Sequence, residues 1–400
     1  MDKNVRRSPF DVRRAPFGVR RSSCDVRRAV FGVRGSLTRQ WLQALLVALV
    51  LFLLLARPAS AQSLARFSLD SAVSIDVFRG QNTVEDPNII VDVTAVLRLA
   101  DGWLLYVRPW FREPRLPHIE DPDSWNKQIY QAAIQYEHAA PISTRVDLGY
   151  IVSPIGLGMM DTRPGVNPTI SPHLSYLQPM PVFDPRAPRV STIASTYPLG
   201  GQLTLSTTRW DARLALVSSA PTRVSVINGA NNPRATPVIV AGGGITPTIG
   251  LRVGAAIATG VYALGEELTV HEEDGRSFHM FNIESEYAVG YTKIAGEYTH
   301  TRLEATTATE TARAWFVQGT RTLSPRWFLA ARQEGVSAPP LRTGIVPGTR
   351  RTFHTTEGTI GYHLTRDFTL RGSFMNRKAY TRTTWDQQLG LSLVWARRWW

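Results

Sequence analysis

The chain contains a single cysteine, Cys24, among its 400 residues. That cysteine lies in an N-terminal segment that we expect to be removed, so the mature protein has no thiol. A chain without thiols excludes a disulfide framework, cysteine nucleophiles and cysteine-ligated metals. After residue 61 lysine is reduced to Lys127, Lys293 and Lys378, and arginine carries the positive charge.

Motifs for enzymatic chemistry are also missing. Gly242-Gly243-Gly244 lacks the lysine of a phosphate-binding loop, His271-Glu272 does not continue into H-E-x-x-H, and no G-x-S-x-G occurs. His279 and His300 lie near serine and glutamate, but nothing in the sequence brings a nucleophile and a base together. We therefore expect no enzyme, no catalytic residue and no cofactor.

Two acidic segments, 118–123 and 266–274, are the only candidates for cation binding. Carboxylate clusters suit Ca²⁺ or Mg²⁺, and outside a cell such ions could bridge lipopolysaccharide phosphates. The alternative, a solvated polar loop, is the ordinary reading of such a cluster. We therefore expect no metal site.

Long apolar runs are absent after residue 56, so no later segment is apolar enough for a transmembrane helix. The one such run, Ala44–Ala56, is too short to span a membrane and suits a signal peptide, with Arg34 and Arg39 before it. The sequence Ala59-Ser60-Ala61 predicts cleavage between Ala61 and Gln62. Residues 33–61 are thus interpreted as a signal peptide and 62–400 as the mature domain.

Residues 1–32 carry a seven-residue repeat beginning VRR. The spacing of its apolar residues does not give a coiled-coil seam. Arg27-Arg28 could be read as a twin-arginine signal, but the same pair recurs in each repeat. We interpret the repeat as an upstream DNA repeat read through, with translation starting near Val33.

Most of the excess positive charge leaves with this leader. The whole chain has a formal charge of +13, and residues 1–61 hold 12 of the 45 basic and 3 of the 32 acidic residues. The mature chain is therefore 33 − 29 = +4. The high isoelectric point does not predict nucleic-acid binding.

The mature chain alternates apolar and polar residues almost from end to end. In the first segment Leu69, Val73, Ile75 and Val77 share one face, while Asp70 and Asp76 share the other. Segments of about ten alternating residues separated by turns are typical of a transmembrane β-barrel. We predict an all-β antiparallel barrel of about 16 strands, within a range of 14 to 18, at 67–78, 89–99, 103–112, 127–138, 145–152, 202–209, 212–220, 237–245, 249–259, 277–287, 291–301, 312–322, 327–335, 351–363, 368–377 and 386–397.

The connections between these segments alternate in length. Short periplasmic turns and long extracellular loops are the pattern of bacterial barrels. We expect the short turns at 100–102, 139–144, 210–211, 246–248, 288–290, 323–326 and 364–367. The longest connection is the third long loop, 153–201.

Aromatic residues lie near the predicted strand ends, where indole and phenol rings suit the lipid headgroup level, although ordinary core aromatics are the alternative. They are Trp103, Trp110, Trp125, Trp210, Trp315, Trp327, Tyr362, Trp385 and Trp395.

The C-terminus ends in an alternating apolar segment, Leu389–Trp395, followed by Ala396–Arg398 and a final Trp400. A last strand that finishes in an aromatic resembles the assembly signal of bacterial outer-membrane proteins. The mature length, the apparent strand number and the dominant third loop resemble the Gram-negative porins. The extra Ala396–Arg398 and the length and proline content of the third loop depart from the family pattern.

The resemblance to porins carries several implications. It implies a location in the bacterial outer membrane, a water-filled channel for small hydrophilic solutes or ions, and Trp400 as the assembly signal. It also implies contact with outer-membrane lipid and lipopolysaccharide, assembly by the barrel-assembly machinery and a homotrimer.

In porins a long third loop folds into the barrel and narrows the pore. By that resemblance Asp161, Arg163, Asp184 and Arg186 are candidate constriction charges. The alternative is a loop packed outside the barrel or at a subunit contact.

Strand phase places further charged residues in the lumen, where hydrated side chains select among solutes. The basic ones are Arg98, Arg108, Arg112, Arg213, Arg252 and Arg371, and the acidic ones are Asp70, Asp76, Asp92 and Asp147. A weakly anion-preferring pore follows from this distribution. The rival hypotheses are a barrel plugged by internal salt bridges, acting in binding or adhesion, and a membrane-embedded hydrolase.

Overall fold

The computed structural model describes residues 67–80, 87–113, 126–157, 163–173, 180–187, 198–217, 238–265, 268–270, 275–340, 351–380 and 382–399. The N-terminal unit Met1–Leu64, which contains the repeat, the signal peptide and Ala61, lies outside these residues, as do Gln62, Asp161 and Trp400. The unit Ala65–Trp400 forms a β-barrel. Within the described residues no helix is long and apolar enough to cross a membrane.

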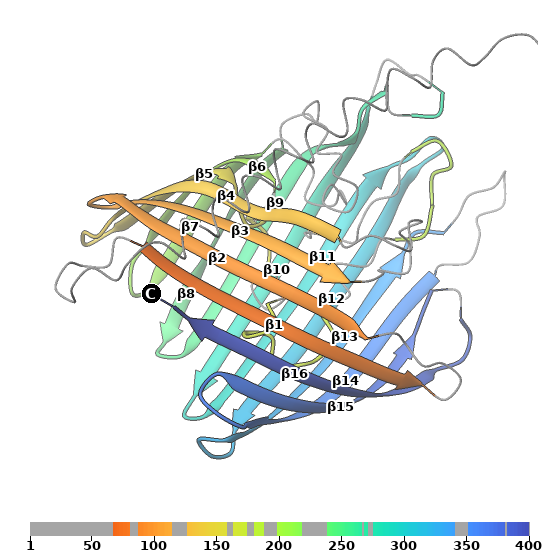
Figure 1. The fold of residues 1–400 in the computed structure, drawn as a ribbon. Helices are drawn as coiled ribbons and strands as arrows, with labels where there is room; N and C mark the ends of the chain where they lie inside the picture. The colour runs from red at the N-terminus through yellow and green to blue at the C-terminus, as the bar shows by residue number, and fades with distance from the viewer. Residues whose placement is uncertain are drawn as a thin grey trace, which may run out of the picture. The chain divides into compact units, whose positions relative to one another are not determined.

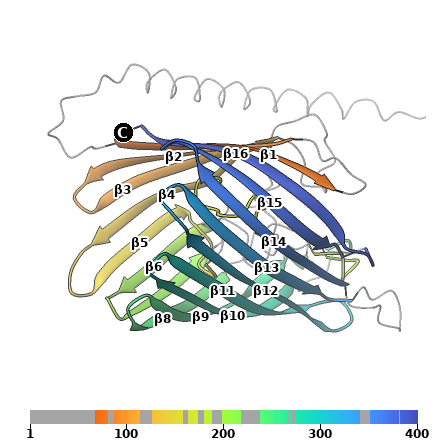
Figure 2. The ribbon, with the colours of Figure 1, turned by 90° about the horizontal axis from the view of Figure 1, so that it is seen from below.

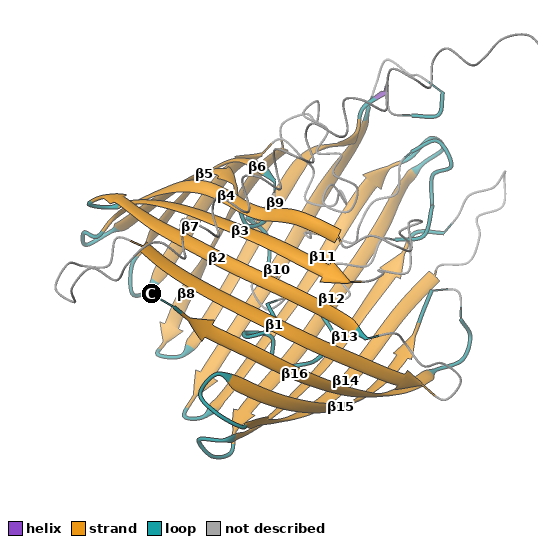
Figure 3. Ribbon diagram, viewed as in Figure 1, coloured by secondary structure: helices purple, strands orange, loops and turns teal. Residues whose placement is uncertain are grey.

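Sixteen antiparallel strands make up the barrel (Figures 1 and 3). They are β1 (Phe67–Gly80), β2 (Asn88–Ala100), β3 (Trp103–Glu113), β4 (Asn126–His138), β5 (Ser143–Tyr150), β6 (Leu199–Ser206), β7 (Trp210–Val217), β8 (Val238–Thr248), β9 (Leu251–Ala263), β10 (Arg276–Val289), β11 (Thr292–Glu304), β12 (Thr309–Thr322), β13 (Trp327–Ala338), β14 (Arg351–His363), β15 (Phe368–Lys378) and β16 (Asp386–Arg398).

Each strand pairs with its neighbour in sequence, and β1 pairs with β16 to close the ring. Figure 2 shows β1 and β16 side by side at this seam. The predicted all-β fold and its strand number are confirmed. Closure leaves no sheet edge, which a barrel in a bilayer requires because lipid cannot satisfy backbone hydrogen bonds.

Some strand limits differ from the prediction because the turns lie elsewhere. Trp210 and Asp211, expected as a turn, are the first residues of β7. The turn is instead built by Thr207, whose hydroxyl accepts hydrogen bonds from the Arg209 and Trp210 N–H groups at 3.1 Å. A threonine hydroxyl can stabilise a turn in this way, a signal that strand phase alone does not reveal.

Connections at one end of the barrel are short: 101–102, 139–142, 207–209, 249–250, 290–291, 323–326 and 364–367. We call this the short-turn end and the opposite one the long-loop end. At the short-turn end Gly102 has φ +75°, and a Cβ there would lie 2.5 Å from the Glu137 carbonyl oxygen. The predicted Asp101-Gly102 turn thus needs its glycine. At the other end, the connection expected at 302–311 is only 305–308.

The outer surface is apolar. Large side chains such as Leu214 (56% exposed), Ile257 (59%) and Leu391 (57%) alternate with buried inward ones. Trp103, Trp210 and Trp327 begin strands at the short-turn end and are 38 to 43% exposed. An apolar band with aromatic residues at its edge is what a bilayer requires of a barrel.

The prediction that Trp110 belongs to this aromatic band is wrong. Trp110 is 6% exposed, shares the inward phase of Arg108 and belongs to a cluster of buried apolar residues inside the barrel.

Candidate pore constriction

Five of the expected pore-lining charges face inward but are almost fully buried: Arg108 (0% exposed), Asp76 (2%), Asp92 (3%), Asp147 (3%) and Arg371 (3%). The phase assigned to them is right, but the expectation of hydrated side chains is wrong. They are covered because other side chains and the third connection pack over the wall, and they are neutralised in pairs.

The pairs are close. The Arg108 guanidinium Nε donates to both Asp92 carboxylate oxygens at 3.0 and 2.9 Å. Arg371 Nη2 lies 3.8 Å from Asp76 Oδ1. Buried ions are tolerated when a partner and additional hydrogen bonds replace water. The wall around β1, β2, β3 and β15 is therefore held by internal ion pairs.

Other inward-facing charges stay accessible, among them Arg145, which was not predicted to line the pore. Arg145 pairs with Asp147 at 2.9 Å while its own side chain is 46% exposed. Asp70 lies 3.7 Å from Arg398, and both are at least half exposed. Arg98 is exposed near the end of β2. Arg112 lies in β3, but its side chain is outside the described residues.

Arg213 and Arg252 form a shared ion cluster across three strands. Both guanidinium groups contact Glu284 Oε1, at 2.9 and 2.7 Å, and Arg252 also contacts Asp211 at 2.8 Å. The two arginine side chains and Asp211 are 15 to 25% exposed, whereas Glu284 is buried. This cluster is part of the charged wall that water can reach.

The glycine run of β8 makes room for that cluster. A Cβ on Gly244 would lie 2.8 Å from Arg252 Nη2, and one on Gly242 would lie 3.0 Å from Arg213 Nε. The motif that fails as a phosphate loop therefore has a structural role, because it lets two arginines lie flat across the strand.

The third connection enters the barrel; its described segments lie inside the ring of strands (Figures 1 and 2). Segment 163–173 is bound to the inner wall by Glu357 of β14. Its carboxylate accepts hydrogen bonds from the Ile170 N–H at 2.9 Å and the Ser171 N–H at 3.2 Å, and one from the Ser171 hydroxyl.

Two arginines complete this attachment from neighbouring strands. Arg332 of β13 donates to Thr169 Oγ1 at 2.8 Å and the Ser171 carbonyl at 2.9 Å. It also lies 3.3 Å from Glu357. Arg371 of β15 donates to the carbonyl groups of Asn167 and Thr169 at 2.7 and 2.9 Å. We call Arg332, Glu357 and Arg371 the wall clamp.

A second segment, 180–187, is attached near the long-loop end. The Asp184 carboxylate accepts hydrogen bonds from the Thr306 N–H at 3.0 Å and hydroxyl at 2.9 Å, and lies 3.6 Å from Arg276. Asp184 is 3% exposed. The expectation that it is a constriction charge is therefore wrong, because its carboxylate holds the connection to the rim.

The remaining constriction candidates are not brought together. Arg163 is half-buried and is the first described residue of the segment that the wall clamp holds. Two residues further on, Gly165 lies close to Ala72 and Ala396 of the barrel wall. Arg186 is exposed, and its carbonyl accepts a hydrogen bond from the Thr269 N–H at 2.9 Å near the long-loop end. Asp161 lies outside the described residues.

The inward face nearer the long-loop end is mostly apolar. Ile155, Met180 and Phe183 of the third connection share one buried cluster with wall residues of β7 to β14. Those wall residues include Val217, Val238, Val240, Ala256, Phe278, Met280, Leu303, Phe316, Val336 and Phe353. Simple alternation predicts a polar lumen throughout, and this half of the interior departs from it.

Arg332, Glu357 and Glu284 are the residues that sequence reasoning missed. Each shares the inward phase of its strand with buried neighbours such as Phe353 and Thr355 beside Glu357. Strand phase could have found them, but no sequence signal links Glu357 to Ser171. His279 and His300 have the outward phase of β10 and β11, so the lumen does not bring them together.

No protein-family model matches the chain, and no curated protein matches its sequence. Solved structures do match in fold. Salmonella typhi OmpF, in a complex with daunomycin, has a TM-score of 0.56 at 10% sequence identity and covers 83% of this chain and 97% of its own. OmpT, an outer membrane protein of Vibrio cholerae, has a TM-score of 0.51 at 10% identity with the same coverage. The chain thus has the porin-like fold of bacterial outer-membrane barrels.

Proposed function

We propose that this barrel is a narrow outer-membrane channel for passive diffusion of small hydrophilic solutes or ions, and not an enzyme. One observation carries the proposal: the third connection is clamped inside the barrel to β13, β14 and β15, and the opposite side of the ring presents a charged wall, Arg145, Asp211, Arg213 and Arg252, that water reaches. Fixed charges beside a constriction select among hydrated solutes. The fold shared with OmpF supports the same reading.

Selectivity belongs to this proposal. The accessible arginines are partly balanced by Asp211 and Glu284, so the preference for anions should be weak. Fixed charges more than roughly 8 Å from a passing ion are screened at physiological salt, so the charges at the narrowest part of the channel should set its ion selectivity. The homotrimer, lipopolysaccharide contacts and barrel-assembly machinery implied by the resemblance are likewise proposals.

A second function has its own support. Buried ion pairs line the inner wall, and the apolar cluster joins residues of the third connection to that wall. A barrel plugged in this way would serve as a binding or adhesion protein. The two functions differ in whether the purified protein conducts.

Single-channel recording in a planar bilayer separates them. The full chain should give discrete conductance steps, with a reversal potential that favours anions weakly and less so as salt rises. Arg332→Met with Glu357→Met removes two of the three clamp charges, which pair with each other, and should raise conductance and its fluctuations as segment 163–173 loosens.

Arg313→Gln is the matched control, because Arg313 is an exposed outward residue of β12 and should leave conductance unchanged. The absence of any conductance in the parent and the clamp variant would contradict the channel and favour the plugged barrel.

A further inference from the structure

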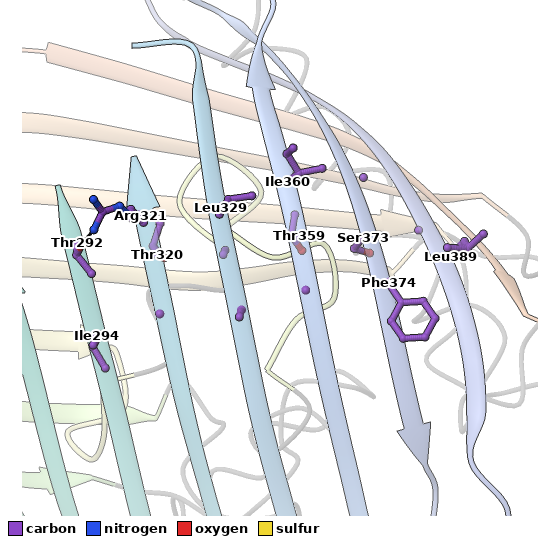
Figure 4. Close-up of a pocket in the computed structure, with 16 residues that line it drawn as sticks. Thr292, Ile294, Thr320, Arg321, Leu329, Thr359, Ile360, Ser373, Phe374 and Leu389 are labelled. Carbon is purple, nitrogen blue, oxygen red and sulfur yellow. Dashed lines mark hydrogen bonds between the residues drawn. The ribbon is translucent and has the colours of Figure 1, made fainter. Parts of the chain in front are cut away.

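The outer surface of the barrel has a groove of about 850 Å³ across β11 to β16 (Figure 4). Its rim is apolar and exposed: Ile294 is 45% exposed, Leu329 42%, Ile360 46%, Phe374 49% and Leu389 64%. Its size falls within the roughly 300–1,000 Å³ of small-molecule sites. The groove faces away from the lumen, so it is separate from the proposed channel.

Small residues form the floor of this groove. Gly319, Ala331 and Gly358 lie directly opposite one another on adjacent strands. Ile294 and Phe374 continue the same row at its two ends. The row is therefore a depression bordered by large side chains.

Packing does not demand these glycines. A Cβ at Gly319 or Gly358 would meet nothing within 4 Å, and neither residue has the positive φ that favours glycine. No register shift interrupts the pairing of β12, β13 and β14 around them. A strand glycine without a bulge or bend often marks close approach by a ligand.

One end of the groove is charged. Arg321, an exposed residue near the end of β12, donates from Nη1 to Thr292 Oγ1 at 3.2 Å. Both residues line the groove at the short-turn end (Figure 4). Trp327 begins the next strand there, and such aromatic residues mark the headgroup level. Arg326 lies in the adjoining turn, with Nη1 3.3 Å from the Tyr362 hydroxyl.

We propose that this groove binds a phospholipid, with acyl chains on the glycine floor and the headgroup phosphate at Arg321 and Thr292. Arginine is suited to phosphate because its donors match the phosphate oxygens. If the short turns face the periplasm, as expected, the lipid belongs to the inner leaflet.

Charge favours a lipid over a second copy of this chain. Among the strand side chains that the structure describes, the one outward-facing carboxylate is Glu304, at the long-loop end of β11. The strands of another copy therefore offer Arg321 no acid, and the short turns at its level carry only Asp101 and Asp367, whereas a phospholipid supplies both the phosphate and the chains.

Native mass spectrometry of the full chain, stripped of lipid in detergent, tests the proposal. Phosphatidylglycerol should bind at one molecule per barrel. Gly358→Leu should fill the floor and weaken binding roughly tenfold, and Arg321→Gln should weaken it by a similar factor, the scale of one charge-assisted hydrogen bond. Diacylglycerol, which lacks the phosphate, should bind more weakly and be insensitive to Arg321→Gln.

Ala255→Leu, an outward small-to-large change on β9, and Arg313→Gln, at the other end of β12, are the matched controls and should bind like the parent. Circular dichroism verifies folding of each variant. Equal binding by all variants would overturn the proposal. Binding of lipopolysaccharide in place of phosphatidylglycerol, or loss of an oligomer rather than of lipid in Gly358→Leu, would also overturn it.

Discussion

Individual buried charges inside the barrel should contribute unequally to stability. Arg332 is 2% exposed and holds segment 163–173 together with Glu357, whereas the side chains of the Arg398–Asp70 pair are 72 and 50% exposed. Removing one partner of a buried ion pair leaves an uncompensated charge, while an exposed pair contributes little.

We therefore expect Arg332→Met to lower the free energy of unfolding by about 3–5 kcal/mol. Arg398→Met should cost less than about 1 kcal/mol. Urea unfolding of the barrel in detergent, followed by tryptophan fluorescence, measures both. Equal losses would show that the wall clamp is as hydrated as the exposed pair.

For single residues, the sequence predicted which face of the sheet a side chain points to better than it predicted how deeply that side chain is buried. The phase of Asp76, Asp92, Arg108 and Arg371 followed from alternation, because side chains on a strand point to opposite faces in turn. Their burial did not follow, because it depends on a connection that arrives from far along the chain. Asp184 was assigned to the pore through the resemblance to porins. Its burial could not be predicted either, because its contact with Thr306 is set by tertiary structure.

At the scale of elements, the third connection is held to the barrel wall by both hydrogen bonds and apolar contacts. His173 lies within it, fully buried, with its ring 4.6 Å from that of Phe316. Burial, and next the nearby positive charge of Arg332, hold the pKa of His173 well below 6.5. The imidazole is therefore uncharged in the folded protein.

This lowered pKa predicts a pH dependence. When the connection is released, His173 regains an ordinary pKa near 6.5 and takes up a proton below it. Its contribution to stability is thus complete above pH 6.5 and is lost as the pH falls below that value. Conductance fluctuations or protease cleavage of the connection should increase over that range.

His173→Phe should flatten this dependence, because phenylalanine keeps the aromatic contact and cannot be protonated. The difference between the parent and the variant isolates His173 from the carboxylates. The same pH profile in both proteins would assign the effect to other groups.

Strand limits were predicted well where glycine marks a turn, as at Asp101-Gly102. They were shifted where a side chain shapes the turn, as at Thr207. The interior of the third connection was beyond prediction, because backbone hydrogen bonds to Glu357 and Arg371 leave no periodic pattern in the sequence.

For the whole molecule, the C-terminal residues bear on assembly. The extra segment Ala396–Arg398 extends β16 in register with β1. Beyond it, Trp399 donates its backbone N–H to the Leu69 carbonyl and its indole N–H to Ser71 Oγ, both at 2.8 Å. Its ring also lies 5.7 Å from that of Trp395.

Deleting Trp399 and Trp400 should therefore reduce the heat-modifiable folded species on gels. Replacing Trp385, an exposed indole at the other end of β16, with leucine is the control and should leave the folded fraction unchanged. Unaltered assembly of the deletion variant would show that the terminal aromatics are not needed.

The seam between β1 and β16 also sets an order of events. Asp70 pairs with Arg398 and Gly80 with Gln388, so the ring is sealed by strands from opposite ends of the folded chain. Bringing such distant segments together carries the largest loop-closure entropy in the barrel. Until then both strands are open templates for another chain. We therefore expect sealing to accompany entry into the lipid, because a chain that stalls beforehand leaves both strand edges open to aggregation.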